Sequence, residues 1–292
     1  MSQQQKYNEY LYFTIHQDTE QDAQDLVKKY QFDRQYGCLS FWNKKQINDE
    51  QTHLFNVMCL KFEIGEVEYL HDISQQIKFW LHHLKHQTQI SNCPLNFIRT
   101  LHLVTHGAND QNAGFHLNHH LLKEFSELSI SFNLHGFLDA DDGQDYPFTT
   151  RLASPLHSKT LSEYAYFWLE SEHYTALELQ QLLPELDFIV DCDQGISQRK
   201  QRKIPNSTRS SLSLKSKLTP TSFQLEEHLQ DVISQIHSYQ SELQILFFDE
   251  NISFGINATG HLASPHHRQI SAATIKQLFL LGINLDVDYY FS

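Results

Sequence analysis

The segment Ile275-Lys-Gln-Leu-Phe-Leu-Leu-Gly-Ile-Asn-Leu-Asp-Val-Asp-Tyr-Tyr290 decides the fold, because its apolar positions change period along its length. Ile275, Leu278 and Leu281 recur at helical spacing, whereas Ile283, Leu285 and Val287 alternate as in a half-buried strand. The same helix–strand pattern occurs about 153 residues earlier in the chain. It consists there of Leu122, Phe125 and Leu128, followed by Ile130, Phe132 and Leu134. The shared spacing predicts an internal repeat.

The beginnings of the two copies also match. Glu9-Tyr-Leu-Tyr-Phe13 recurs as Glu163-Tyr-Ala-Tyr-Phe167, an offset of about 154 residues. A helical pattern follows each, near residues 23–30 and 177–183, and a strand-like segment comes next, at residues 54–62 and 211–218. The order of predicted elements is therefore the same in both copies up to this point.

Two apolar stripes at helical spacing follow and predict helices that face the core. They comprise Ile73, Ile77, Trp80, Leu81 and Leu84 in the first copy, and Leu225, Leu229, Val232, Ile233 and Ile236 in the second. Apolar runs at residues 101–104 and 243–248 come next, each followed by a second strand-like segment, at 114–117 and 252–256. These pairs predict a hairpin in each copy.

The element order in each copy is β-α-β-α-β-β-α-β, which predicts an α+β fold of two tandem repeats. We expect the helices to pack on one face of a mostly antiparallel sheet, in a variant of the split βαβ arrangement. The acidic segment from Asp139 to Pro147 has the charge, Gly and Pro of a linker. The predicted domains are residues 1–140 and 161–292, joined by an acidic linker at 141–160.

The composition limits the classes of partner. The formal net charge of −13 disfavours nonspecific binding to nucleic acid and favours a basic partner. The N-terminus lacks the apolar region of a signal peptide, and no apolar run reaches the length of a membrane span. The four cysteines form no Cys-x-x-Cys pair, which indicates reduced, buried thiols. We therefore expect a cytoplasmic protein that does not contact membranes.

Three segments of the second copy resemble an uncharacterised bacterial family, the "domain of unknown function" numbered four-two-seven-nine. They are Glu163-Tyr-Ala-Tyr-Phe-Trp168, Leu225-Glu-Glu-His-Leu-Gln-Asp-Val-Ile233 and the closing segment Ile275–Tyr290. The first copy is similar only faintly, since Ser129-Ile-Ser-Phe-Asn-Leu-His-Gly136 lacks the closing Asp-x-Asp-x-Tyr form. The resemblance supplies no activity and no catalytic residue. By analogy with other small bacterial families it implies an intracellular module that binds and blocks a toxin.

Three groups of histidines could in principle bind a metal. The groups are His82, His83 and His86; His116, His119 and His120; and His261, His266 and His267. His82 and His86 have the i,i+4 spacing of metal ligands, but the adjacent glutamate of the zinc-protease motif is missing and Lys85 adds a positive charge. Polar helix and loop positions explain all three groups more simply, so we predict no metal.

Asp286 and Asp288 lie on one face of the closing strand, where two carboxylates could bind a cation or share a proton. Their alternation with apolar residues indicates the polar side of a half-buried strand, and the first copy has Asn133 and His135 at the matching positions. The common nucleophile-elbow, dinucleotide and phosphate-loop motifs are absent from the sequence. We predict no enzyme activity and no cofactor, although a triad of distant residues would leave no local motif.

The sequence thus favours an immunity (antitoxin-type) protein that binds and neutralises a basic cognate toxin. The candidate contact residues are acidic and fall in two stretches. They are Asp18, Glu20, Asp22 and Asp25 near the N-terminus, and Asp139, Asp141, Asp142 and Asp145 in the linker. The alternative is a module that binds a small ligand or regulatory partner in a groove between the two repeats.

Overall fold

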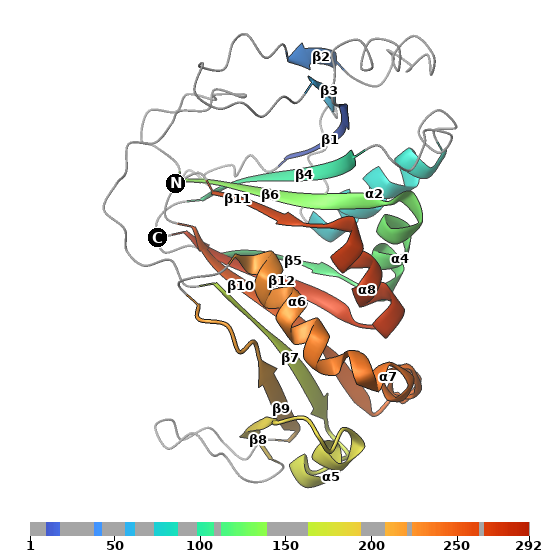
Figure 1. The fold of residues 1–292 in the computed structure, drawn as a ribbon, viewed down its shortest axis with the longest axis vertical. Coiled ribbons are helices and arrows are strands. Elements are labelled where there is room, and N and C mark those ends of the chain that lie inside the picture. The colour runs from blue at the N-terminus through green and yellow to red at the C-terminus, as the bar shows by residue number, and fades with distance from the viewer. Residues whose placement is uncertain are drawn as a thin grey trace, which may run out of the picture.

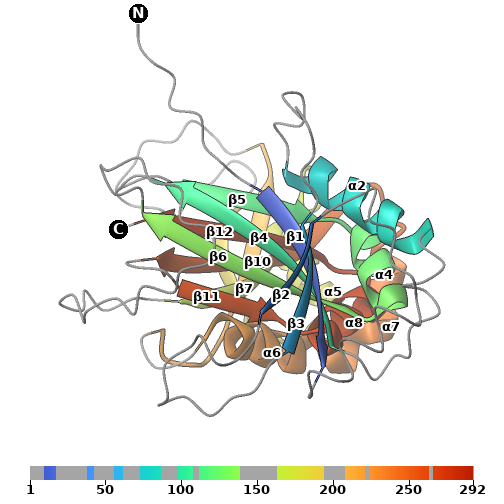
Figure 2. The same ribbon diagram turned by 90° about the horizontal axis from the view of Figure 1, so that it is seen from above.

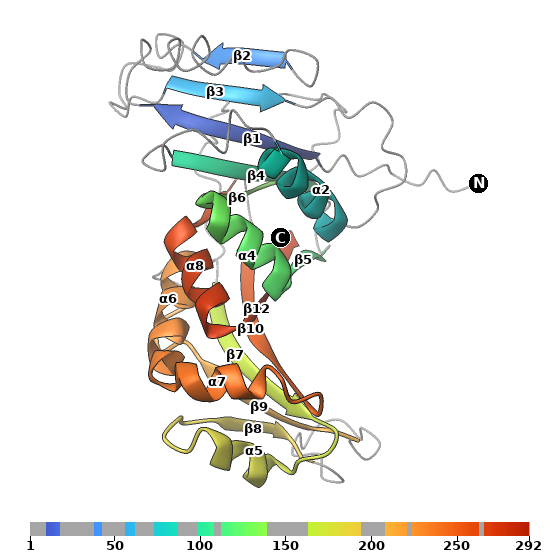
Figure 3. The ribbon, with the colours of Figure 1, turned by 90° about the vertical axis from the view of Figure 1, so that its right-hand side faces the viewer.

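The part of the chain that the structure describes folds into an α+β structure with two mixed six-stranded sheets. The structure is a computed structural model. It describes residues 10–17, 38–42, 56–61, 73–86, 98–107, 112–138, 163–193, 208–220, 224–262 and 266–291. Figure 3 shows the strands following one another along the long axis, from β2 at one end to β8 at the other.

Sheet A has the strand order β11-β6-β4-β1-β3-β2. Its strands are β1 (Tyr10–Gln17), β2 (Cys38–Trp42), β3 (Asn56–Lys61), β4 (Ile98–Gly107), β6 (Ile130–Leu138) and β11 (His266–Ile270). β4 and β6 run parallel, and the other neighbouring strands are antiparallel.

Sheet B has the strand order β5-β12-β10-β7-β9-β8. Its strands are β5 (Asn112–Leu117), β7 (Tyr164–Ser171), β8 (Ile189–Cys192), β9 (Ser210–Lys215), β10 (Ile252–Leu262) and β12 (Asn284–Phe291). β10 and β12 run parallel, and the other neighbours are antiparallel. Both sheets are therefore mostly antiparallel, as predicted, with one parallel pair each.

The longer helices gather on one side of the strands (Figure 1). The helices are α2 (Ile73–His86), α4 (His119–Leu128), α5 (Ala176–Leu182), α6 (Leu225–Ile236), the 3-10 turn η3 (His237–Tyr239), α7 (Gln240–Leu246) and α8 (Ala272–Leu281). Every residue of the two predicted apolar stripes is buried, on α2 and on α6. The helix prediction from spacing is confirmed for both segments.

Helices α4 and α8 pack against each other and are capped in the same way at both ends. Asn118 caps α4 by accepting a hydrogen bond from the Leu121 N–H, and Ser271 caps α8 by accepting from Thr274. Each helix ends in the left-handed region, at Ser129 (φ 50°) and Gly282 (φ 72°). Only the second of these is glycine, for which that conformation carries no steric cost.

Each half of the chain gives one strand to the sheet formed mainly by the other half. β5 pairs with β12, from Leu117↔Leu285 to Asn112↔Tyr290, and β11 pairs with β6. Figure 2 shows β11 running alongside the green β6. The predicted hairpins are therefore wrong: β5 does not pair with β4, and the run at 243–248, expected to pair with 252–256, forms no strand. The reason is physical, because local sequence sets a strand's alternation but not which distant strand will be its partner.

The apolar run at residues 243–248, predicted as a strand, instead forms most of α7 and the turn after it. Its Leu243 and Leu246 are buried, while the side-chain amides of Gln240 and Gln244 donate hydrogen bonds to the Leu280 carbonyl at the end of α8. A short apolar run is compatible with a strand or with a helix, and here packing against α8 stabilises the helix. The short strands β2, β8 and β11 were also not predicted.

The predicted linker, residues 141–160, lies outside the described residues, so the domain boundaries stay a prediction. Among the helices that the structure describes, none combines the length and the apolar character needed to cross a bilayer.

Two partly or fully buried histidines should make stability depend on pH. Burial lowers the pKa of His228, which is fully buried with Nδ1 2.9 Å from the Ser216 Oγ, and burial also lowers the pKa of His119. The unfolded chain then binds more protons below the ordinary pKa of 6.5. We expect the free energy of unfolding to fall as the pH drops below that value, measured by urea titration.

The matched variants test this assignment. His228→Gln should reduce the slope of stability against pH, whereas His82→Gln, at an exposed position on α2, should leave it unchanged. An equal slope in wild type and His228→Gln would contradict a buried, neutral His228.

Candidate partner-binding surface

One face of sheet B points away from the helices and carries polar and aromatic side chains. On β12, Leu285 and Val287 are buried on the helix side, so the alternation turns Asp286 and Asp288 to the other side. The strand register aligns Asp286 with His116 on β5 and with Asn257 on β10, and Asn257 in turn with Tyr166 on β7. We call this side the outward face. It consists of His116, Tyr164, Tyr166, Trp168, Asn257, Asp286 and Asp288.

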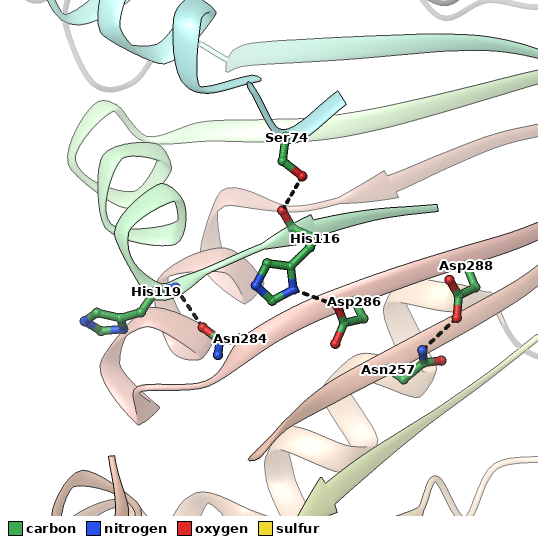
Figure 4. Close-up of polar contacts among 7 residues, drawn as sticks. All are labelled: Ser74, His116, His119, Asn257, Asn284, Asp286 and Asp288. Atoms are coloured by element: carbon green, nitrogen blue, oxygen red, sulfur yellow. Dashed lines mark hydrogen bonds and ion pairs between the residues drawn. The ribbon is translucent and has the colours of Figure 1, made fainter. Parts of the chain in front are cut away.

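The two carboxylates have separate partners. The His116 Nδ1 lies 2.6 Å from Asp286 Oδ1, and the Asn257 side-chain amide donates to Asp288 Oδ2 at 2.8 Å (Figure 4). The Thr259 hydroxyl donates to the Asn257 side-chain oxygen at 2.8 Å, which fixes the orientation of the amide. The geometry therefore favours two separately held acids over a pair that shares one proton.

His116 links three parts of the chain. Its ring meets Asp286 of β12, and its main-chain carbonyl accepts a 3.0 Å hydrogen bond from the Ser74 hydroxyl at the start of α2 (Figure 4). The side chains of His116 and Asp286 are 47% and 32% exposed, so their contact faces solvent. The contact is an ion pair when His116 is protonated. Two residues 170 positions apart thus meet on one open surface.

A stacked pair of tyrosines on β7 lies on the same face, separated from the carboxylates by β10. The rings of Tyr164 and Tyr166 lie 6.4 Å apart at 21°. Burial, and after it the nearby Tyr164, Asp288, Asp191 and Asp286 in that order, together raise the pKa of Tyr166 to about 12. The Tyr166 hydroxyl therefore keeps its proton at neutral pH and can donate a hydrogen bond beside acidic groups.

Two glycines allow close contacts at this face. A Cβ on Gly114 would lie 2.7 Å from Asp288 Oδ1 and 2.8 Å from the Val287 carbonyl, and one on Gly255 would lie 2.9 Å from the Trp168 ring. Glycine at these positions lets β5 approach β12 and lets the indole lie on β10.

The residues predicted to contact a partner are not among those that the structure describes. This applies to all eight acids, Asp18, Glu20, Asp22, Asp25, Asp139, Asp141, Asp142 and Asp145. The structure neither brings them together nor separates them, and their role stays a prediction.

The histidine groups do not converge within the described residues. The rings of His82 and His86 contact each other at 4.3 Å on an exposed face of α2. His116 faces Asp286, the His119 ring contacts Phe247 and Phe279, and His120 lies 3.7 Å from Glu124. Across the ranges that the structure describes, no group of three His, Cys, Asp or Glu side chains could hold a metal ion. His261, His266 and His267 lie in β10 and β11.

Comparison with known families finds a match in the C-terminal half. Residues 160–292 match the family described as Domain of unknown function (DUF4279). The DUF4279 match contains every strand of sheet B except β5, which the N-terminal half supplies. Neither a curated protein nor a solved structure matches the chain.

Sequence reasoning considered Asp286, Asp288 and His116 as cation or metal ligands but explained them as polar strand and loop positions, and it missed the aromatic part of the face. Tyr164-Ala-Tyr166-Phe-Trp168 alternates, with Ala165 and Phe167 buried, so its outward aromatics could have been found from period two. Their position beside Asp286 depends on the β7–β10–β12 register, which the sequence does not encode locally.

Proposed function

We propose that this chain is a non-enzymatic, cytoplasmic protein of the immunity (antitoxin) type, which binds a basic toxin and blocks it. The observation that carries the proposal is the outward face of sheet B, which Asp286 and Asp288 on β12 share with Tyr164 and Tyr166 on β7, across the intervening strand β10. Tyr and Trp are enriched at protein interfaces because they combine a large apolar area with a polar group. Carboxylates beside them complement the Lys and Arg side chains of a basic partner.

The charge of the whole chain supports the same partner class. A net charge of −13 attracts a basic protein over distance and accelerates association at low salt. The stacked tyrosines also offer ring faces to an ammonium or guanidinium group.

We further infer that the two halves are tandem copies of one domain. If each strand of the first half is matched with the strand six places later in the chain (β1 with β7, β6 with β12), the two sheets have the same strand order. In this matching β11 of sheet A corresponds to β5 of sheet B. In both sheets a helix, α4 or α8, connects directly to the second strand of the parallel pair. This correspondence supports duplication, with β5 and β11 exchanged between the copies.

The test is recovery of the partner from the native host. The tagged chain should copurify at low salt with a stoichiometric basic protein encoded by a neighbouring gene, identified by mass spectrometry. The double variant Asp286→Asn/Asp288→Asn should bind that protein about tenfold more weakly and with a smaller salt dependence. Isothermal titration at two salt concentrations measures both effects.

A charge-matched control separates the face from the net charge. Glu185→Gln/Asp187→Asn removes the same two charges from exposed positions between α5 and β8, and it should leave the affinity nearly unchanged. Equal weakening by both variants would remove the outward face from the proposal. Recovery of no protein partner would instead favour the binding of a small ligand.

A further inference from the structure

An apolar patch is exposed where α7 ends against α8. Four large apolar side chains form this surface, which we call the α7 patch. They are Ile245 (72% exposed), Phe247 (41%), Phe248 (81%) and Leu280 (45%). Contiguous exposed apolar groups of this size are typical of surfaces that bind another molecule.

The four residues lie together at the end of α7 and on the adjacent last turn of α8. The Phe247 and Phe248 rings contact edge to face at 5.4 Å, and the Phe248 N–H donates to the Ile245 carbonyl at 3.1 Å, which places these two residues one turn apart. Leu280 lies next to α7, since the Gln240 and Gln244 amides bind its carbonyl. Figures 1 and 3 show α7 beside α8, on the side where the helices gather.

The patch rests on a fixed base. The His119 ring contacts Phe247 and stacks on Phe279, both with centroids 4.9 Å apart. The His119 main-chain N–H donates to the Asn284 side-chain oxygen at 2.9 Å, which anchors the start of α4 to β12 (Figure 4). A base held by three elements loses little conformational entropy when a partner binds.

The charge around the patch indicates what covers it. Glu242 lies on α7, and Asp249 and Glu250 directly follow Phe248. The Asn251 main-chain N–H holds the pKa of Asp249 below its ordinary value, so this carboxylate is ionised at neutral pH. Lys276 of α8 lies one turn before Leu280, at the other end of the patch. The Phe248 end is therefore acidic.

We propose that the α7 patch is a docking surface for an amphipathic helix of another protein, with an apolar stripe and Lys or Arg residues at the end that meets Asp249 and Glu250. Basic residues complement this end, whereas a second copy of the chain would bring another net charge of −13 to the contact. The anionic surface of a membrane would be repelled for the same reason. This surface lies on the helix side of sheet B, so the proposal does not depend on the outward face.

Two synthetic peptides serve as probes of this surface. Both are roughly 14 residues long and carry a Leu and Phe stripe at helical spacing, and they differ only in having Lys or Glu residues at one end. Fluorescence anisotropy should show binding of the Lys peptide to the full chain, and none of the Glu peptide. The variant Ile245→Ser/Phe248→Ser should weaken binding at least about tenfold, because it removes the two most exposed apolar groups of the patch.

Control variants make the result specific. Leu177→Ser removes a side chain of similar exposure (65%) from α5 and should not change binding. Asp286→Asn/Asp288→Asn should also leave peptide binding unchanged, so failure of this proposal and failure of the proposed function can be told apart. Circular dichroism should show native folding for every variant, because the altered side chains are exposed or half-exposed.

Three outcomes would overturn the proposal. The first is no binding of the Lys peptide, or binding that Ile245→Ser/Phe248→Ser leaves intact. The second is a concentration-dependent dimer in sedimentation that Phe248→Ser abolishes, which would assign the patch to a second copy. The third is Phe248-dependent cosedimentation with anionic lipid vesicles, which would assign it to a membrane.

Discussion

Expressed without residues 1–160, the C-terminal half will not be a folded monomer. It would lack β5, the neighbour of β12, and β6, the neighbour of β11. Loss of β5 also removes the buried side chains Phe115 and Leu117, each of which contributes about 1.5–3 kcal/mol by burial. That loss is a large fraction of a typical domain stability of about 5–15 kcal/mol. Light scattering should show dimers, in which β11 of one copy pairs with β12 of the other, or larger species.

Two controls separate strand exchange from loss of the chain connection. Coexpression of residues 1–160 with residues 161–292 should give a one-to-one complex. The full chain with a protease site inserted between residues 140 and 160 should stay assembled after cleavage. A monomeric C-terminal half that unfolds at the temperature of the full chain would contradict the interdependence of the halves.

A point variant tests the same contact in the intact chain. Gly114→Ala places a Cβ 2.8 Å from the Val287 carbonyl, a main-chain atom that cannot move away alone, and should displace β5 from β12. Gly260→Ala is the matched control, because no atom lies within 4 Å of its added Cβ. Hydrogen exchange of the β12 amides should accelerate in the first variant only.

Glu163→Gln should lower the free energy of unfolding by about 3–5 kcal/mol, as expected when a buried ion pair loses one partner. Glu163, at the start of β7, is 3% exposed and pairs with Arg268 of β11, so the contact ties the two sheets together. Thermal or urea unfolding of the full chain measures the loss. The exposed pair Lys85–Glu127, at 2.9 Å, is the control, and its removal should cost about 0–1 kcal/mol.

The pH dependence of a second variant identifies the cause. Burial raises the pKa of Glu163, and the Arg268 guanidinium opposes this effect. In Arg268→Met the opposing charge is gone, so the pKa of Glu163 rises further and the carboxyl takes up a proton in mild acid. The destabilisation should therefore be smaller at acidic than at neutral pH. A cost that does not vary with pH would show that Glu163 is not buried beside this guanidinium.

The closing helix and strand illustrate what local pattern can predict. Ile275, Leu278 and Leu281 lie buried on α8, and Leu285 and Val287 are buried on β12, as their spacing predicted. The run at 243–248 was assigned wrongly because a six-residue run with five apolar residues fits a strand and a helical turn equally well. The exchange of β5 and β11 could not be predicted, since alternation is the same whichever sheet a strand joins.

The candidate site was predictable only in part, for a related reason. The carboxylates Asp286 and Asp288 follow from alternation on one strand. Their neighbours His116, Asn257 and Tyr166 come from three other strands, and the register that aligns them depends on long-range pairing. Local sequence also does not reveal an exposed apolar patch such as Phe247 and Phe248. In the sequence these residues cannot be told from buried core residues, because their exposure depends on tertiary packing.

The exchange of β5 and β11 has a consequence for how the gene can change. His116 and Asp286 contact each other although their codons lie 170 positions apart. A substitution of either residue therefore changes which substitutions of the other are tolerated. Recombination that deleted one half would leave the remaining half with an unpartnered strand and an open sheet edge. The exposed faces of the two halves can therefore change separately, whereas the residues of β5, β6, β11 and β12 that join the halves cannot.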